Sequence, residues 1–193
     1  MSIALLTEGL SDQWFLLPLI DRQVEELELA SPHGFDFANT VPGSRFTVAP
    51  RERVSEEVEM LLDHMDLVIL HHDHNERSKV EAVRASLRKV EDADRVVGLV
   101  PVRETEAWML ADPAVLPDTP AAAVRDLIRS SRDVERVPDP KKALAQAFGP
   151  RHRPEYEFDR LGQRMSLAAL RQVPAYARWV AELSRALQKL RFL

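Results

Sequence analysis

The chain has 193 residues, of which 45% are hydrophobic and 30% are charged, and its formal net charge is −5 at pH 7. This length suits one domain, or one domain with a smaller appendage, with enough apolar residues for a sizeable core. Cysteine is absent, which excludes disulfides, zinc–cysteine sites and thiol nucleophiles and favours a reducing, cytoplasmic setting.

The N-terminal stretch MSIALLTEGL lacks a basic leader, so we expect no signal peptide. No apolar run approaches the roughly 20 residues that span a bilayer, so we expect no membrane segment.

Apolar runs alternate with amphipathic stretches in the first half of the chain. We predict strands at residues 2–7, 66–70 and 95–102, and helices at residues 11–29, 51–65 and 76–90. Ser11 is a plausible N-cap of the first helix, and Pro18 should kink or interrupt it. Residues 31–50 contain Pro and Gly breakers, and we expect a loop there with one or two short strands, one of them near residues 45–48.

Strands that are apolar on both faces and alternate with helices predict an α/β fold with a mainly parallel sheet covered on both sides. After Asp112 the chain becomes rich in Ala, Leu and Arg at helical spacing. We therefore expect an α/β core in residues 1–112 and a mostly helical C-terminal section in residues 113–193, packed on that core. Its predicted helices lie at residues 120–131, 140–148, 162–173 and 174–190.

The charge is unevenly distributed along the chain. Residues 120–193 contain 15 Lys and Arg against 8 Asp and Glu, which leaves 11 against 23 in residues 1–119. This asymmetry fits an acidic catalytic centre beside a surface that attracts polyanions. It equally fits a solvated helical surface rich in Arg, and the sequence leaves both interpretations open.

Acidic residues follow each of the three predicted strands. Glu8 follows the first strand, Asp73 the second, and Glu104 and Glu106 the third. The carboxyl ends of parallel strands share one edge of the sheet, where α/β proteins bind ligands. For Glu8 alone, a helix-start acid favoured by the helix dipole is an alternative.

The segment HHDHN, residues 71–75, offers two kinds of metal ligand. Asp73 and Asn75 supply hard oxygen atoms that suit Mg²⁺. The three histidines of the segment favour a softer metal such as Zn²⁺ or Mn²⁺, but neighbouring strand residues point to opposite faces, so at most two of them can converge.

The segments TEGLSD, HHDHN, PVRETEAWMLAD and PDPKKAL resemble a TOPRIM-like family of unassigned function, domain-of-unknown-function family 4276. The resemblance implies a TOPRIM-like Rossmannoid sheet and divalent-metal chemistry on phosphodiesters. It also implies a role beside an ATPase in bacterial anti-phage defence, as in the overcoming-lysogenization-defect nucleases.

Carried over by position, the resemblance makes Glu8 a general acid/base or metal ligand and Asp73 the first acid of a D-x-D motif. Glu104 or Glu106 would complete the metal shell. Asn75 stands where the second acid of D-x-D is expected, which is a departure, because a neutral oxygen binds a cation more weakly than a carboxylate.

These observations predict a phosphodiesterase, most simply a nuclease, that uses Mg²⁺ or Mn²⁺. Glu8 or His72 would move protons, and Lys141 and Lys142 would contact nucleic-acid phosphates. An ATPase subunit and a second copy of the chain are further expected partners. The alternative is a non-catalytic TOPRIM-like regulatory or scaffold subunit. A nucleotide-binding protein of the G-x-G-x-x-G or G-K-[ST] type is disfavoured because neither motif is present.

Overall fold

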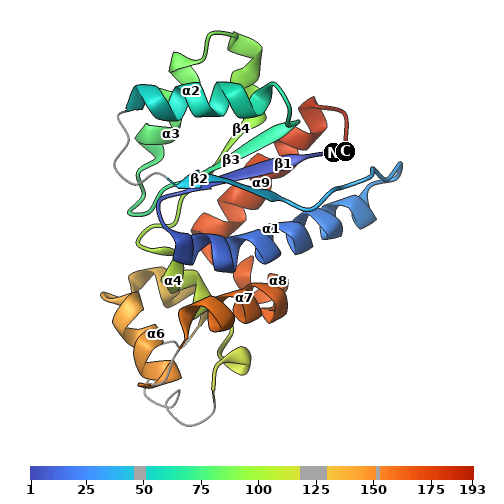
Figure 1. Ribbon diagram of the computed structural model, residues 1–193. Helices are drawn as coiled ribbons and strands as arrows, with labels where there is room; N and C mark the ends of the chain where they lie inside the picture. Colours follow the sequence, from blue (N-terminus) through green and yellow to red (C-terminus); the bar gives the residue numbers. More distant parts are fainter. Residues whose placement is uncertain (46–50, 118–129, 151–152) are drawn as a thin grey trace.

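The computed structural model describes residues 1–45, 51–117, 130–150 and 153–193, and its centre is a four-stranded parallel sheet (Figure 1). The strands are β1 (Ile3–Thr7), β2 (Val41–Arg45), β3 (Leu67–His71) and β4 (Val96–Leu99), in the order β2-β1-β3-β4. This confirms the predicted α/β fold. The strand expected near residues 45–48 is β2, which ends at Arg45; residues 46–48 lie outside the described part.

The helices predicted at residues 11–29, 51–65, 76–90, 140–148 and 174–190 are present, most with shifted ends. The observed helices are α1 (Leu10–Ala30), α2 (Arg51–Leu62), α3 (Arg77–Ser86), α4 (Thr105–Met109), α6 (Pro140–Phe148), α7 (Pro154–Arg164), α8 (Leu167–Leu170) and α9 (Pro174–Lys189), of which α4 and most of α7 were not predicted. Short 3₁₀ helices are η1 (Val90–Arg95), η2 (Pro113–Val115) and η3 (Ser131–Arg136). The single helix expected at residues 162–173 is wrong, because α7 ends at Arg164 and Ser166 caps a separate α8. The helix expected at residues 120–131 lies almost entirely outside the described residues.

Each face of the sheet is covered by its own apolar cluster. Ile3, Leu5 and Ile69 pack beneath α1 and α9, and this cluster continues into α4, α6 and α7. Ala4, Leu6 and the alternate residues of β3 pack against α2 and α3 on the opposite face. The strands therefore have to be apolar on both faces, as the sequence is. The division after residue 112 stays a prediction, since residues on both sides of it share the first cluster.

Helix α1 continues through Pro18, so the expected interruption is wrong. Helix α7 packs unusually close to it: a Cβ at Gly162 would lie 2.3 Å from the carbonyl oxygen of Phe15. Arg22, one turn further along α1, donates hydrogen bonds of 2.8 Å to the carbonyls of Gly162 and Met165. We attribute the unbroken helix to this packing, which outweighs the local cost of proline.

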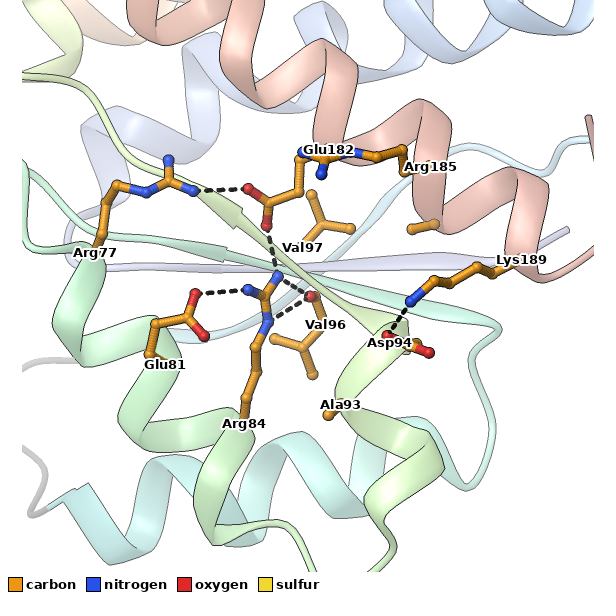
Figure 2. Close-up of a pocket in the computed structure, with 11 residues that line it drawn as sticks. Arg77, Glu81, Arg84, Ala93, Asp94, Val96, Val97, Glu182, Arg185 and Lys189 are labelled. Atoms are coloured by element: carbon orange, nitrogen blue, oxygen red, sulfur yellow. Dashed lines mark hydrogen bonds and ion pairs between the residues drawn. The ribbon is translucent and has the colours of Figure 1, made fainter.

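Glu182 of α9 seals the open edge of the sheet at β4 (Figure 2). Its carboxylate accepts a hydrogen bond of 2.9 Å from the N–H of Gly98 and pairs with Arg84 and Arg77 at 2.5 and 2.9 Å. Arg84 in turn donates to the carbonyl of Val96. Backbone groups that could otherwise pair with a strand of another chain are thus hydrogen-bonded to side chains.

No helix among the described residues is long and apolar enough to cross a membrane.

We expect Glu182→Gln to lower the free energy of unfolding by about 1–3 kcal/mol, because the charge that both arginines share disappears from a largely buried position. Urea unfolding followed by circular dichroism measures this. The matched control is Asp94→Asn, which removes an exposed partner of Lys189 and should cost less than about 1 kcal/mol. Equal losses for the two variants would contradict a special role for Glu182.

Candidate metal centre at the carboxyl edge of the sheet

The strand order places the ends of β1 and β3 side by side. Their pairing runs from Ile3–Leu67 to Leu6–Leu70, and the chain leaves β1 toward β2 on one side and β3 toward β4 on the other. Such a switch point opens a crevice outside the carboxyl ends of the strands, where α/β proteins bind ligands. Glu8 follows β1, and His72 and Asp73 follow His71, the last residue of β3, so the two predicted segments meet at this edge of the sheet.

A buried triad forms on the α1 side of this edge. Asp12, His71 and Asp73 each offer a ligand atom, and these atoms lie within 4.8 Å of one another. His71 Nε2 lies 3.2 Å from Asp73 Oδ1 and 2.9 Å from the hydroxyl of Thr105. Thr105 also donates its backbone N–H to Asp73 Oδ1 at 3.1 Å. The start of α4 therefore fixes the triad.

Asp12 was missed by the sequence analysis. It lies in the first turn of α1, whose N-cap is Gly9 and not the expected Ser11. A Cβ at Gly9 would lie 3.0 Å from Asp12 Oδ2, so the glycine of the TEG segment leaves room for this carboxylate. The signal available in the sequence was an acid four residues after Glu8, which alone reads as an ordinary helix-start residue.

Burial shifts the pKa values of the triad residues, because it disfavours their charged forms. Burial raises the pKa of Asp12, and the nearby Asp73 raises it further, against the effect of His71. Burial opposes the charged form of His71, but the hydrogen bond to Asp73 and the charge of Asp12 outweigh it and raise its pKa. In the described part of the chain, no Lys or Arg forms an ion pair with Asp12 or Asp73.

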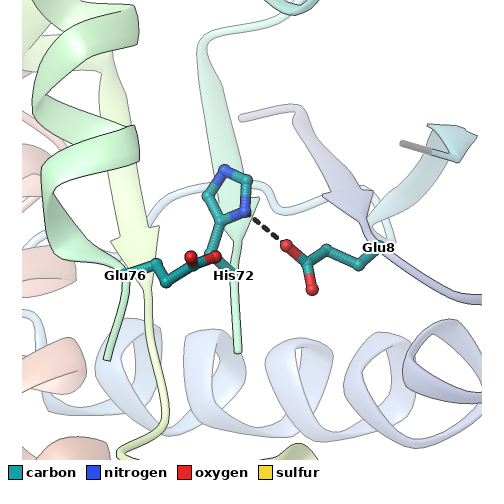
Figure 3. A group of neighbouring side chains, drawn as sticks. All are labelled: Glu8, His72 and Glu76. Atoms are coloured by element: carbon teal, nitrogen blue, oxygen red, sulfur yellow. Dashed lines mark hydrogen bonds and ion pairs between the residues drawn. The ribbon is translucent and has the colours of Figure 1, made fainter. Parts of the chain in front are cut away.

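A second, more exposed group consists of Glu8, His72 and Glu76, at the ends of the same two strands (Figure 3). Glu8, His72 and Glu76 also bring ligand atoms within 4.8 Å of one another. His72 Nδ1 lies 2.8 Å from Glu8 Oε1, and this hydrogen bond is the main reason that the pKa of Glu8 falls to about 2. The ammonium of Lys79 pairs with Glu76 and lies 3.7 Å from Glu8. This group therefore already contains a balancing cation.

The HHDHN segment divides its side chains between the two groups. His71 enters the triad and His72 faces Glu8, as expected for neighbours at a strand end. His74 and Asn75 are exposed and both adopt left-handed backbone conformations, with φ of 57° and 56°. Their N–H groups donate to the carbonyls of Arg103 and Pro101, which fastens the turn to the loop after β4.

The two glutamates after β4 have different surroundings. Glu104 lies at the rim and pairs with Lys141 of α6 at 2.9 Å. Glu106 is buried, its Oε2 has no hydrogen-bond partner among the described residues, and burial raises its pKa to about 7. Asp12 and Asp73 are close enough to raise this pKa further. Of the two, Glu106 is the one whose pKa responds to the carboxylates of the triad.

Lys141 and Lys142 differ as well. Lys141 belongs to the acidic edge through Glu104, whereas the side chain of Lys142 is exposed and its backbone N–H is capped by Asp139. Their predicted contacts with phosphates stay predictions.

Glu135 of η3 links α4 to its neighbours through hydrogen bonds. Its Oε1 accepts hydrogen bonds of 3.2 Å from Trp108 Nε1 and from the N–H of Val102, and its Oε2 accepts one of 3.2 Å from Ala175. Trp108 is fully buried in the core and packs edge-on against Tyr176. The C-terminal section thereby positions the residues that hold the triad.

The Glu8–His72 pair should make stability depend on pH. The pKa of Glu8 is about 2 in the folded chain against an ordinary 4.5, so the pair stabilises the fold above pH 4.5 and loses this effect as pH falls toward 2. Glu8→Gln should therefore unfold more easily than wild type at pH 6, by about 1 kcal/mol because solvent screens the pair. The difference should shrink by pH 3 in urea unfolding; a constant difference would contradict the assignment.

Comparison with known proteins gives a family. No curated protein and no solved structure gives a significant match. A family model described as a domain of unknown function, DUF4276, matches residues 7–184, which include both acidic groups and most of the C-terminal helices. The chain belongs to this DUF4276 family.

Proposed function

We propose that the protein is a divalent-metal-dependent phosphodiesterase, and specifically a nuclease. The observation that carries this proposal is the buried triad of Asp12, His71 and Asp73 at the switch point of a parallel sheet. These two buried carboxylates share one imidazole and pair with no Lys or Arg among the described residues, which is costly unless a cation neutralises them. Metal-dependent hydrolysis of phosphodiesters is the chemistry that the motif resemblance to TOPRIM proteins implies for such a site.

The donor set of the triad fits a divalent cation. Asp12 and Asp73 provide hard oxygen ligands, and His71 provides an imidazole whose Nδ1 is buried without a hydrogen-bond partner among the described residues. Carboxylates suit Mg²⁺ and Mn²⁺, and the imidazole shifts the preference from Mg²⁺ toward Mn²⁺. When bound, the cation would polarise the scissile phosphate and acidify a water molecule.

His72 is the residue that we propose to move the proton. The Glu8 carboxylate holds its Nδ1 at 2.8 Å, so the proton on Nδ1 is fixed and Nε2 is the basic nitrogen. With a pKa of about 2, Glu8 itself is a weak base near neutrality. We therefore assign to Glu8 the positioning of His72, in place of the acid/base role that the resemblance implied.

The departure at Asn75 has a backbone explanation. Asn is one of the residues that tolerate the left-handed conformation found here, and its N–H fastens the turn to Pro101. Asp12 supplies the second carboxylate from another segment. An active site therefore does not require an acid at position 75.

The proposed partners are supported by observations outside the triad. Lys141 and Lys142 stand at the rim on the basic C-terminal section, which supports nucleic acid as the substrate. A cytoplasmic location, an ATPase partner and a role in anti-phage defence rest on composition and on the motif resemblance alone, and a homodimer is a further proposal.

A non-catalytic regulatory or scaffold subunit is the second candidate. The observation that favours it is that His71 and Asp73 already contact one another and Thr105, and that Lys79 balances Glu8 and Glu76. A chain that needs no metal to satisfy these groups would act by binding its partner.

Metal binding and cleavage together decide between these functions. We expect calorimetry to detect Mn²⁺ binding to the wild-type protein, and Asp12→Asn and Asp73→Asn to weaken it roughly tenfold or more. With Mn²⁺ or Mg²⁺, the wild type should cleave supercoiled DNA, single-stranded DNA or an RNA oligonucleotide, and both variants should lose this activity.

Asp94→Asn serves as the control, because Asp94 is an exposed carboxylate that pairs with Lys189. It should retain metal binding and cleavage. Metal binding without cleavage of any substrate would favour the non-catalytic subunit, and absence of metal binding would overturn the metal centre.

A further inference from the structure

A separate cavity lies next to the metal centre, among α1, α4, α6 and α7, which gather on one side of the sheet (Figure 1). Its volume is about 350 Å³, within the usual range of about 300–1,000 Å³ for ligand pockets. Its lining consists of Ser11, Trp14, Glu106, Lys141, Leu144, Ala145, Pro154 and Phe158. None of these residues except Glu106 and Lys141 entered the site described above.

The cavity borders the triad directly along the chain. Ser11 precedes Asp12 in α1, and Glu106 follows Thr105 in α4. Glu106 lines the cavity and is near enough to Asp12 and Asp73 to feel their charges, so a group in the cavity would lie close to the triad. Lys141 also lines the cavity, and its ammonium pairs with Glu104 at the acidic edge.

The lining combines aromatic walls with a few polar groups. Trp14 is half-buried and Phe158 is buried, and Leu144 and Pro154 add further apolar surface. Glu106 is 5% exposed, and its Oε2 is buried without a hydrogen-bond partner among the described residues. An unpaired buried oxygen of this kind costs free energy that a ligand N–H or O–H could recover.

We propose that this cavity binds an unpaired nucleobase next to the phosphodiester held at the metal centre, with Trp14 as its stacking surface and Glu106 as its hydrogen-bond partner. The inference rests on the proposed function and adds its substrate class. A planar ligand with an apolar face and a polar edge matches aromatic walls with a single unpaired carboxyl oxygen. A cation beside the cavity, Lys141, matches the phosphate that such a base carries.

The proposal predicts a preference for single strands. A base inside a duplex is stacked and paired, so it must be unpaired and unstacked before it can enter the cavity. Single-stranded DNA or RNA should therefore bind more tightly than a duplex of the same sequence. A free nucleoside monophosphate should compete for the cavity if one base and one phosphate suffice, whereas only oligonucleotides should bind if neighbouring phosphates are required.

Trp14 makes this binding measurable without catalysis. The chain has three tryptophans, and Trp108 and Trp179 are fully buried. A base that stacks in the cavity should quench the fluorescence of Trp14. Titration with single-stranded oligonucleotides in EDTA should give this quenching, an abasic oligonucleotide should not, and Trp14→Phe should abolish the signal while a labelled oligonucleotide still binds.

Two further variants test the contact itself. Trp14→Ala should weaken binding of the labelled single strand roughly 5- to 100-fold, as expected for loss of one stacking surface. Ala145→Leu fills the cavity from α6 and should also weaken it, whereas Gln146→Leu, on the same helix but outside the lining, should not.

Because these measurements use no metal, they separate this inference from the nuclease proposal. Base-dependent quenching without cleavage would support the cavity and overturn the nuclease. Cleavage with equal affinity for normal and abasic strands, and no effect of Trp14→Ala or Ala145→Leu, would overturn the cavity and leave the nuclease standing.

Discussion

The parallel pairing of β1 with β3 is the constraint on which the rest of the site depends. These strands are 60 residues apart in the chain, yet their register brings Leu6 opposite Leu70, so the segments that follow them emerge together. Because β2 and β4 lie on opposite sides of this pair, the connections diverge at this edge, which is where α/β proteins bind ligands. The buried aliphatic residues on both faces of the strands make that arrangement rigid. Polar groups can then be placed at the edge without weakening the core that supports them.

The two acidic groups at this edge differ in how their charge is balanced. At the more exposed group, Lys79 pairs with Glu8 and Glu76, and solvent screens what remains. In the described part of the chain, no Lys or Arg pairs with the triad. The pKa of Asp12 is raised because two carboxylates are buried together with only one imidazole. A buried carboxylate pair can reduce that cost by protonation or by binding a cation. This difference is why we assign the metal to the triad and proton transfer to the pair of His72 and Glu8.

Much of the architecture could be predicted from the sequence, and the limits have local causes. The aliphatic runs predicted β1, β3 and β4, because strands covered on both faces must be apolar throughout. Asp12 escaped prediction since a helix-start acid has many uses, and only the fold brings it to His71 and Asp73. The continuity of α1 through Pro18 depends on α7, whose Gly162 packs against Phe15 and Pro18 although it is far from them in the chain. The partition of Glu104 and Glu106 depends on Lys141, whose position no local pattern encodes.

The C-terminal section is part of the site's physical construction. Glu135 accepts three hydrogen bonds, which join α9, Trp108 and the loop after β4. Trp108 belongs to α4, and α4 begins with Thr105, whose hydroxyl contacts His71 of the triad. Lys141 of the basic C-terminal section pairs with Glu104 at the acidic edge, so the oppositely charged parts of the chain are in contact there. The packing of α6, α7 and α9 therefore has two effects: it completes the core over α1, and it supports the α4 segment whose Thr105 contacts His71 and Asp73. A truncation after Asp112 would remove both, so the acidic segments alone do not constitute the site.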